Sequence, residues 1–330
     1  MNTSPAEGAP GAVPPAPSWR ARVDRALAWL CRALMGIFFR EVQVQGLARV
    51  PRGVPLVLVA NHHNSLIDPL LVLAHLDAHP RFLAKSTLWD IPVMRRLLDL
   101  GGVIPVYRRQ DEGVDHSQNL QTFARCHEEL ARGGAISLFP EGISHSAPHL
   151  AEVKTGAARI VLEAEETYGP LGSFVVPVGL TFDEKGTFRS RALVRVGDPI
   201  AIEAWRARHE AADADARREI VRELTSEIRE GLAAVTLNYP SIEDVRAVAR
   251  AAEMAARDSH ELPARMAMDE AFAIRQDFIE AGMALRERFP ERMDALRDRI
   301  SRFDDELQRL RLRDDQVAAR YPHLETLAYV

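Results

Sequence analysis

The sequence predicts an α/β fold in which a mostly parallel sheet is covered by helices, with an N-terminal amphipathic helix and a C-terminal helical extension. Between about residues 41 and 200, apolar strand-like runs alternate with helical patterns, which is typical of a parallel sheet. Residues 56–60 and 174–180 are apolar almost without interruption, which suits strands buried on both faces. The expected strands are 42–44, 56–60, 82–84, 103–107, 135–139, 174–182 and 192–196, and the helical patterns lie near 69–77, 89–100, 117–132 and 154–168.

The length and composition fit a globular protein. The chain has 330 residues, of which 47% are hydrophobic and 27% charged, and this length leaves room for two domains. A formal net charge of −5 argues against a general nucleic-acid binder, because such a protein needs a basic surface. Cys31 and Cys126 are too few for a disulfide scaffold and lack metal-site spacing, which favours a reducing, cytoplasmic setting.

The N-terminal segment is expected to divide into a disordered tail and an amphipathic helix. Residues 1–18 are rich in proline and small residues and contain no secretory signal pattern. Apolar side chains recur at helical spacing across residues 19–40, and arginines flank them. Such a helix can lie in a membrane interface on anionic lipid, pack on the core of its own domain, or do both. No stretch reaches the roughly 20 apolar residues that span a bilayer, so the expected location is peripheral or monotopic, on the cytoplasmic face of a membrane.

The remainder of the chain is expected to contain an α/β domain, residues 41–200, and a helical C-terminal region, residues 201–330. Strand patterns vanish beyond Pro199, and the composition turns to Ala, Arg, Glu, Leu and Asp with prolines between segments. This pattern predicts a helical hairpin or bundle docked on the α/β domain. An apolar stripe in this region fits a packing face better than a partner-binding surface.

A histidine pair and an aspartate follow one of the expected buried strands. Residues 61–68 read Asn-His-His-Asn-Ser-Leu-Ile-Asp and come directly after the strand at 56–60. An open α/β fold places its chemistry at such a strand end, and a histidine oriented by a carboxylate is a general base near neutral pH. Metal binding and simple backbone hydrogen bonding are the competing interpretations, although no third metal ligand has supporting spacing nearby.

Two histidine–aspartate pairings are possible in this segment. His63 lies five residues before Asp68, and His62 lies six residues before it. On one continuous helix these separations would place the partners about 140° and about 240° apart, so a hydrogen bond needs a turn. Asn64 and Ser65 supply turn and N-cap chemistry for it.

With Pro69 added, this segment resembles the first motif of the glycerolipid acyltransferase family, which includes lysophosphatidate and glycerol-3-phosphate acyltransferases. The commonest family spacing, with four residues between histidine and aspartate, is met by His63. In a large bacterial subgroup, similar also to fungal glycerol-3-phosphate acyltransferases, the histidine directly follows the asparagine, as His62 does. The surrounding residues resemble that subgroup, which favours His62 as the catalytic base, oriented by Asp68, and keeps His63 as the alternative.

A second segment, residues 102–109, resembles the family's second motif. It reads Gly-Val-Ile-Pro-Val-Tyr-Arg-Arg. The resemblance implies that Arg108, or Arg109 next to it, binds the phosphate of the acceptor, because a guanidinium fork suits phosphate oxygens. Without the resemblance, an arginine solvated at a strand end is the simpler interpretation.

A third segment, residues 139–144, reads Phe-Pro-Glu-Gly-Ile-Ser and resembles the third motif. The resemblance implies that Glu141 accepts a hydrogen bond from the acceptor's glycerol hydroxyl or orients a phosphate-binding arginine. Gly142 is implied to let the backbone approach the ligand closely. Ile143 and Ser144 are closer to the bacterial and fungal subgroup than to the rest of the family.

Two further segments complete the resemblance. Lys154 and Gly156 open a helical pattern at a place where the subgroup also has a lysine and a glycine. Lys154 either adds positive charge near the phosphate or only caps the helix. Residues 175–180 resemble the fourth motif and are expected to form a core strand that shapes the acyl or acceptor pocket.

The resemblance implies transfer of a fatty acyl group from acyl-CoA or acyl carrier protein to a hydroxyl of a glycerol phosphate, with 1-acylglycerol 3-phosphate as the expected acceptor. The acyl thioester is a substrate, and neither a metal nor a redox cofactor is implied. Expected partners are the thioester, the phosphorylated acceptor, a membrane surface and, as one option, acyl carrier protein; no nucleic acid is expected. The alternatives are glycerol 3-phosphate or another lysophospholipid as acceptor, thioester hydrolysis, and a catalytically silent membrane-surface scaffold. A serine hydrolase is disfavoured because the sequence has no Gly-x-Ser-x-Gly elbow.

Overall fold

The computed structural model describes residues 18–107, 119–259, 266–312 and 317. Contacts group the chain into two units, Met1–Leu237 and Asn238–Val330. The tail expected at residues 1–18 lies, apart from Ser18, outside the described residues.

The first unit is built on an eight-stranded sheet with the order β1-β7-β6-β2-β5-β3-β4, and β8 pairs with β6. β6 runs antiparallel to β7 and β8, and the other described neighbours are parallel. The predicted fold class is therefore confirmed. Every strand that the sequence predicts is present, and the two-residue β8 is an addition. The strands are β1 (Glu41–Gln45), β2 (Leu56–Ala60), β3 (Arg81–Lys85), β4 (Ile104–Val106), β5 (Ala135–Leu138), β6 (Phe174–Phe182), β7 (Arg191–Val196) and β8 (Ile200–Ala201).

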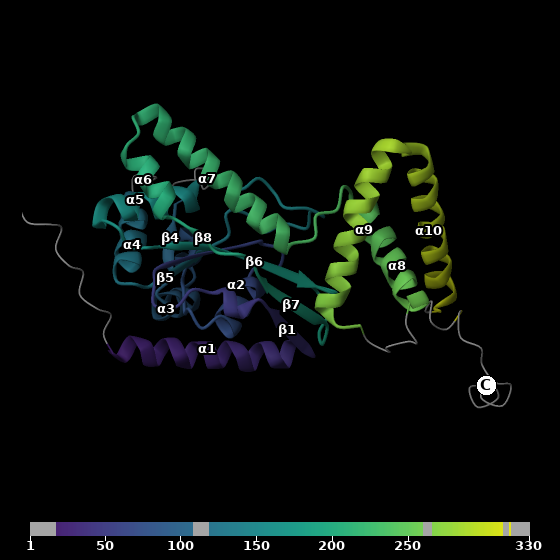
Figure 1. Ribbon diagram of the computed structural model, residues 1–330. Helices are drawn as coiled ribbons and strands as arrows, with labels where there is room; N and C mark the ends of the chain where they lie inside the picture. The colour runs from purple at the N-terminus through teal and green to yellow at the C-terminus, as the bar shows by residue number, and fades with distance from the viewer. Residues whose placement is uncertain (1–17, 108–118, 260–265, 313–316, 318–330) are drawn as a thin grey trace, which may run out of the picture. The chain divides into compact units, whose positions relative to one another are not determined.

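Helices cover both faces of the sheet (Figure 1), and β2 separates the two halves of the core. Val57 and Val59 point into a cluster that contains side chains of α4, α5 and α7. Leu56, Leu58 and Ala60 point into a second cluster, with α1 and α2. Because the side chains of a strand alternate between its faces, the unbroken apolar run of β2 reflects burial on both sides. The helices are α1 (Ser18–Phe38), α2 (Ile67–His75), α3 (Pro92–Gly101), α4 (Asn119–Ala131), α5 (Gly156–Tyr168), α6 (Glu203–Glu210) and α7 (Ala214–Val235), and two 3₁₀ turns are η1 (Leu47–Arg49) and η2 (Ser86–Asp90).

The first helix, α1, buries one face and exposes the other. Cys31 and Met35 are buried in the cluster that α1 shares with α2. Asp24 accepts two hydrogen bonds, both of 2.7 Å, from the guanidinium of Arg81 at the start of β3. Trp29, on the outer face, is 69% exposed. The helix therefore packs on its own domain while it presents apolar side chains to the outside, and its contact with a membrane stays a prediction.

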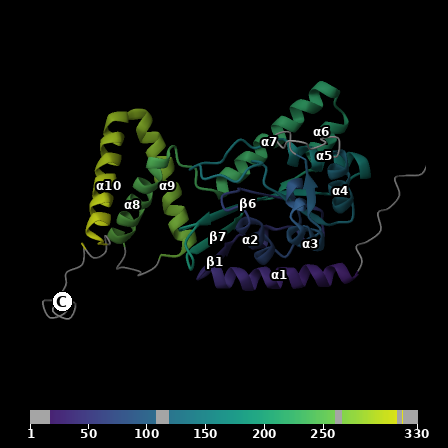
Figure 2. The same ribbon diagram turned by 180° about the vertical axis from the view of Figure 1, so that it is seen from behind.

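The C-terminal helices fall into two groups. α6 and α7, which lie in the region 201–330 expected to be helical, contact α5 and belong with the first unit; α7 also contacts β6. In the second unit, three described helices contact one another (Figure 2). Phe272, Ile279 and Leu307 are buried there. These helices are α8 (Ile242–Ser259), α9 (Met268–Arg288) and α10 (Pro290–Leu310). Within the described ranges, no helix of either unit is long and apolar enough to cross a bilayer.

Candidate active site

The loops that follow β2 and β5 emerge side by side at one edge of the sheet. β2 and β5 are adjacent and parallel, with Val59 paired to Leu138, so both chains leave the sheet in the same direction. The loop after β2 leads to α2 on one face, whereas the loop after β5 leads to α5 on the other. Open α/β sheets bind ligands at such a point, outside the carboxyl ends of the strands.

His62 and Asp68 are hydrogen bonded across the turn that follows β2. Nδ1 of His62 lies 2.9 Å from Oδ2 of Asp68, and the backbone N–H of Asn64 donates to the same oxygen at 2.7 Å. The turn includes Ser65, whose φ of 38° lies in the left-handed region. Asp68 is fully buried in the first turn of α2, where the helix dipole favours a negative charge. Because a carboxylate only accepts, Nδ1 carries the ring proton and Nε2 carries the lone pair.

The His62 ring is held by an aromatic neighbour and keeps one nitrogen without a partner among the described residues. Nε2 makes no hydrogen bond to any residue that the structure describes, and the side chain remains 15% exposed. The ring stacks on Phe139, with centroids 4.0 Å apart and an interplanar angle of 13°. Phe139 in turn stacks on Phe82 at 6.2 Å. The stacked Phe139 therefore fixes the plane of the imidazole, while Asp68 fixes its Nδ1 edge.

His63, the alternative base, has different partners. Its Nδ1 lies 3.2 Å from the backbone carbonyl oxygen of His145, so it donates there and leaves Nε2 unprotonated. Burial is the main reason that the pKa of His63 is lowered, which keeps the ring neutral. No hydrogen bond links His63 to a carboxylate among the described residues. Of the two sequence alternatives, the structure joins His62 to Asp68.

Glu141, from the loop after β5, is buried and holds the backbone of His62. Its Oε1 accepts a 2.8 Å hydrogen bond from the backbone N–H of His62. Its Oε2 accepts from the backbone N–H of Ala151 at 2.8 Å and from Nε2 of His145. The side chain of Glu141 is completely buried. The first and third motifs are thus joined directly.

The other residues expected in the site are placed as follows. Gly142 has a φ of 74°, and a Cβ atom built there would lie 2.8 Å from Nζ of Lys154. Lys154 therefore reaches the backbone of the third motif, which it also meets through its own N–H, bonded at 3.0 Å to the carbonyl of Pro140. Arg108 and Arg109 lie outside the described residues.

The chain is similar in sequence to known acyltransferases. Residues 41–181 match a protein-family model described as Acyltransferase. This part of the chain is therefore similar to the acyltransferase family. An uncharacterized acyltransferase of Schizosaccharomyces pombe is 24% identical to the chain over 304 residues, which cover 67% of the chain and 45% of that relative.

Several further relatives have named activities. Glycerol-3-phosphate O-acyltransferase 2 of Saccharomyces cerevisiae is 32% identical over 130 residues, which cover 39% of this chain and 17% of that protein. A chloroplastic 1-acyl-sn-glycerol-3-phosphate acyltransferase of Arabidopsis thaliana is 26% identical over 163 residues, which cover 49% of this chain and 42% of that protein. The chain therefore spans less than half the length of each of these three relatives.

The first unit also brings residues to the site that the sequence analysis leaves without a role. Phe139 supports the ring of His62, and His145 bonds to Glu141. Nζ of Lys185, in the β6–β7 loop, donates to the carbonyl of His63 at 3.3 Å. The four-residue spacing of Glu141 and His145 would join them on a helix, but this loop is not helical, so the sequence carries no signal for these contacts.

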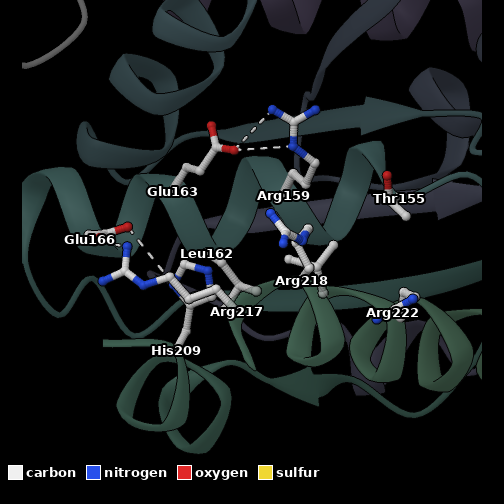
Figure 3. Close-up of a pocket in the computed structure, with 10 residues that line it drawn as sticks. Thr155, Arg159, Leu162, Glu163, Glu166, His209, Arg217, Arg218 and Arg222 are labelled. Carbon is white, nitrogen blue, oxygen red and sulfur yellow. Dashed lines mark hydrogen bonds and ion pairs between the residues drawn. The ribbon is translucent and has the colours of Figure 1, made fainter. Parts of the chain in front are cut away.

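The described residues show no metal site, and a second hollow lies elsewhere in the first unit. Within residues 18–107, 119–259 and 266–312, no group of three or more His, Cys, Asp or Glu side chains could hold a metal ion. A groove of about 600 Å³ lies between α5 and α7 (Figure 3), away from the His62 pair. Arg159 and Arg217 line this groove, and they are already paired with Glu163 and Glu166. The candidate site is therefore the edge of the sheet where His62, Asp68 and Glu141 meet.

Proposed function

We propose that the protein transfers a fatty acyl group from a thioester to a hydroxyl of a glycerol phosphate, with 1-acylglycerol 3-phosphate as the acceptor. The observation that carries this proposal is the 2.9 Å hydrogen bond between His62 and Asp68, which leaves Nε2 unprotonated and without a partner among the described residues. The match of residues 41–181 to the acyltransferase family model supports the reaction class. The names of the budding-yeast and Arabidopsis relatives support a glycerol phosphate as acceptor and leave glycerol 3-phosphate as the second candidate.

In the proposed reaction His62 acts first as a base and then as an acid. Nε2 takes the proton of the acceptor hydroxyl while the hydroxyl oxygen attacks the carbonyl carbon of the thioester. When the tetrahedral intermediate collapses, the carbon–sulfur bond breaks, and the imidazolium returns the proton to the departing thiolate. Asp68 stabilises the imidazolium between these steps, as the carboxylate of a catalytic triad does.

No covalent acyl-enzyme is part of this proposal. Burial raises the pKa of the Cys126 thiol to about 12, and burial also raises the pKa of Cys31. A buried, protonated thiol is a poor nucleophile.

Arg108, Arg109 and Lys154 are proposed to supply positive charge for the acceptor phosphate. Either coenzyme A or acyl carrier protein is proposed to carry the acyl group.

An acceptor panel tests this proposal. Labelled acyl-CoA is offered with glycerol 3-phosphate, with 1-acylglycerol 3-phosphate, or alone, and the lipid product and the released thiol are both measured. We expect phosphatidate to form from 1-acylglycerol 3-phosphate, with little thiol released when no acceptor is present. Equal thiol release with and without acceptor would indicate a thioesterase, and product from glycerol 3-phosphate alone would reassign the acceptor.

We also propose that the protein lies on the cytoplasmic face of a membrane through the outer surface of α1 and α3. The two helices contact each other, and α3 has no buried residue although half of it is apolar. Val93 and Leu97 of α3 are 73% and 56% exposed, and Trp29 and Ile37 of α1 are 69% and 62% exposed. Exposed arginines lie among these apolar side chains, as anionic lipid requires. These arginines are Arg22, Arg25, Arg95 and Arg96.

Paired serine substitutions test the membrane proposal. The double variants Trp29→Ser with Ile37→Ser, and Val93→Ser with Leu97→Ser, are expected to weaken vesicle binding at least about tenfold. Full burial of one such side chain is worth about 1.5–3 kcal/mol, and about 1.4 kcal/mol corresponds to a factor of ten. The measurement is co-sedimentation with vesicles of phosphatidylcholine and phosphatidylglycerol. Leu120→Ser is the control, because Leu120 is 79% exposed on α4, which covers the other face of the sheet; equal losses in all three variants would contradict the proposal.

A further inference from the structure

A second carboxylate–imidazole pair lies beside the first. The side chains of Glu141 and His145 are 0% and 12% exposed, and they bond to each other. An ionised carboxylate offers about four lone-pair positions. Three of those on Glu141 are taken by His62 N–H, Ala151 N–H and the ring of His145. The fourth position, on Oε1, is shielded because the side chain of Glu141 is completely buried, so a substrate does not reach it.

The ring of His145 is equally committed. The backbone N–H of Ala147 lies 3.1 Å from Nδ1 of His145. A backbone N–H can only donate, so Nδ1 is the unprotonated nitrogen and the ring proton sits on Nε2. Nε2 is therefore the donor to Glu141. With both nitrogens engaged, His145 has neither a lone pair for a base nor a second proton for a phosphate.

The backbone of His145 also forms hydrogen bonds to the first motif, residues 61–69. Its N–H donates to the carbonyl of His62 at 3.1 Å, and its carbonyl accepts from Nδ1 of His63 at 3.2 Å. The peptide groups on both sides of His62 are thus held by the third motif, one by Glu141 and one by His145. Asp68 fixes the imidazole at its other end.

We infer that Glu141 and His145 form a positioning pair that fixes where the imidazole of His62 stands, and that neither side chain contacts the acceptor. This inference rests on the proposed function, because it assigns the pair to the same base. It also gives Glu141 a different task from the acceptor contact that the motif resemblance implies. Loss of the pair then lowers kcat and leaves KM for the acceptor nearly unchanged.

Substitutions of His145 separate its two hydrogen bonds. The amide nitrogen of Gln can reach the place of Nε2, so His145→Gln keeps a donor to Glu141. The side-chain oxygen of Asn takes the place of Nδ1, so His145→Asn keeps only the acceptor for Ala147. We expect His145→Ala and His145→Asn to lower kcat up to about 100-fold, since a displacement of about 1 Å can cost that much, and His145→Gln to recover most of it.

The matched control is His149→Ala, because His149 lies on the same loop and is exposed. It is expected to keep the wild-type kcat, and every variant is expected to keep a cooperative thermal transition. Glu141→Gln is expected to follow His145→Ala in lowering kcat. A Glu141→Gln enzyme with unchanged kcat and a raised acceptor KM would overturn the inference, as would a His145→Asn enzyme as active as His145→Gln.

A readout without turnover distinguishes this inference from the proposed function. In protein labelled with ¹⁵N-histidine, the ring signals of His62 are identified by their loss in His62→Ala. They are expected to shift or broaden in His145→Ala, to return in His145→Gln and to be unchanged in His149→Ala. An inactive wild-type enzyme with this pattern would refute acyl transfer and keep the positioning pair, whereas unshifted His62 signals in His145→Ala would refute the pair.

Discussion

His62→Ala is expected to lower the acceptor-dependent kcat/KM by a factor of about 10²–10⁴, because a positioned general base contributes about that factor. His63→Ala is expected to lose no more than about fivefold, the equivalent of one ordinary hydrogen bond of about 1 kcal/mol. The difference follows from their partners: Nδ1 of His62 meets the carboxylate of Asp68, whereas Nδ1 of His63 meets a backbone carbonyl. A carboxylate stabilises an imidazolium far better than a neutral carbonyl does.

The measurement is the initial rate of phosphatidate formation at several acceptor concentrations. Thermal unfolding of both variants serves as the control, since both rings are partly buried and either change can loosen the loop. If His63→Ala were the inactive variant and His62→Ala stayed active, the base would have to be reassigned to His63. The carbonyl of His145 would then be its orienting group.

Asp68→Asn is the second large effect, with an expected loss in kcat of about 10³–10⁴. Oδ2 of Asp68 accepts from both His62 Nδ1 and the N–H of Asn64. If the amide oxygen of Asn takes that place, both hydrogen bonds survive but the charge that stabilises the imidazolium is gone. If the amide nitrogen takes it, the His62 ring is forced into the tautomer that carries its proton on Nε2 and cannot act as a base.

The control for this variant is Asp77→Asn. Asp77 lies just beyond the other end of α2, and its side chain is 80% exposed and pairs with Arg32 at 4.0 Å. Single-turnover acyl transfer is the measurement, because it isolates chemistry from product release. An Asp68→Asn enzyme within a few-fold of the wild-type rate would refute the oriented-base mechanism.

Most of the sheet could be predicted because strands that are buried on both faces have unbroken apolar sequences. β2 is the clearest case, since Val57 and Val59 serve one cluster and Leu56, Leu58 and Ala60 the other. The strand β8 could not be predicted, because a two-residue pairing carries no periodicity. The grouping of α7 with the sheet depends on tertiary contacts with β6 that no local pattern records.

Within the candidate site, sequence spacing indicated which loops meet but not which atoms bond. The choice between His62 and His63 depends on the path of the turn through Ser65, whose positive φ is not specified by a serine. The partners of His145 depend on the course of a loop without regular structure, from Glu141 to Ala151. The sequence pattern therefore leaves two residues as the candidate base. It assigns Glu141 to the acceptor or to a phosphate-binding arginine and indicates no role for His145.

The paired charges that join α1 to β3 limit how this protein can be dissected. Arg81 and Asp24 are almost completely buried, and loss of one member of such a pair costs about 3–5 kcal/mol, a large part of the roughly 5–15 kcal/mol that keeps a domain folded. Deletion of residues 1–40 would also expose the apolar side chains on which Met35 packs. The helix α1, which is proposed to contact lipid, is thus part of the folded domain and cannot be deleted without destabilising it. Point substitutions on its exposed face are therefore needed to separate membrane binding from catalytic turnover.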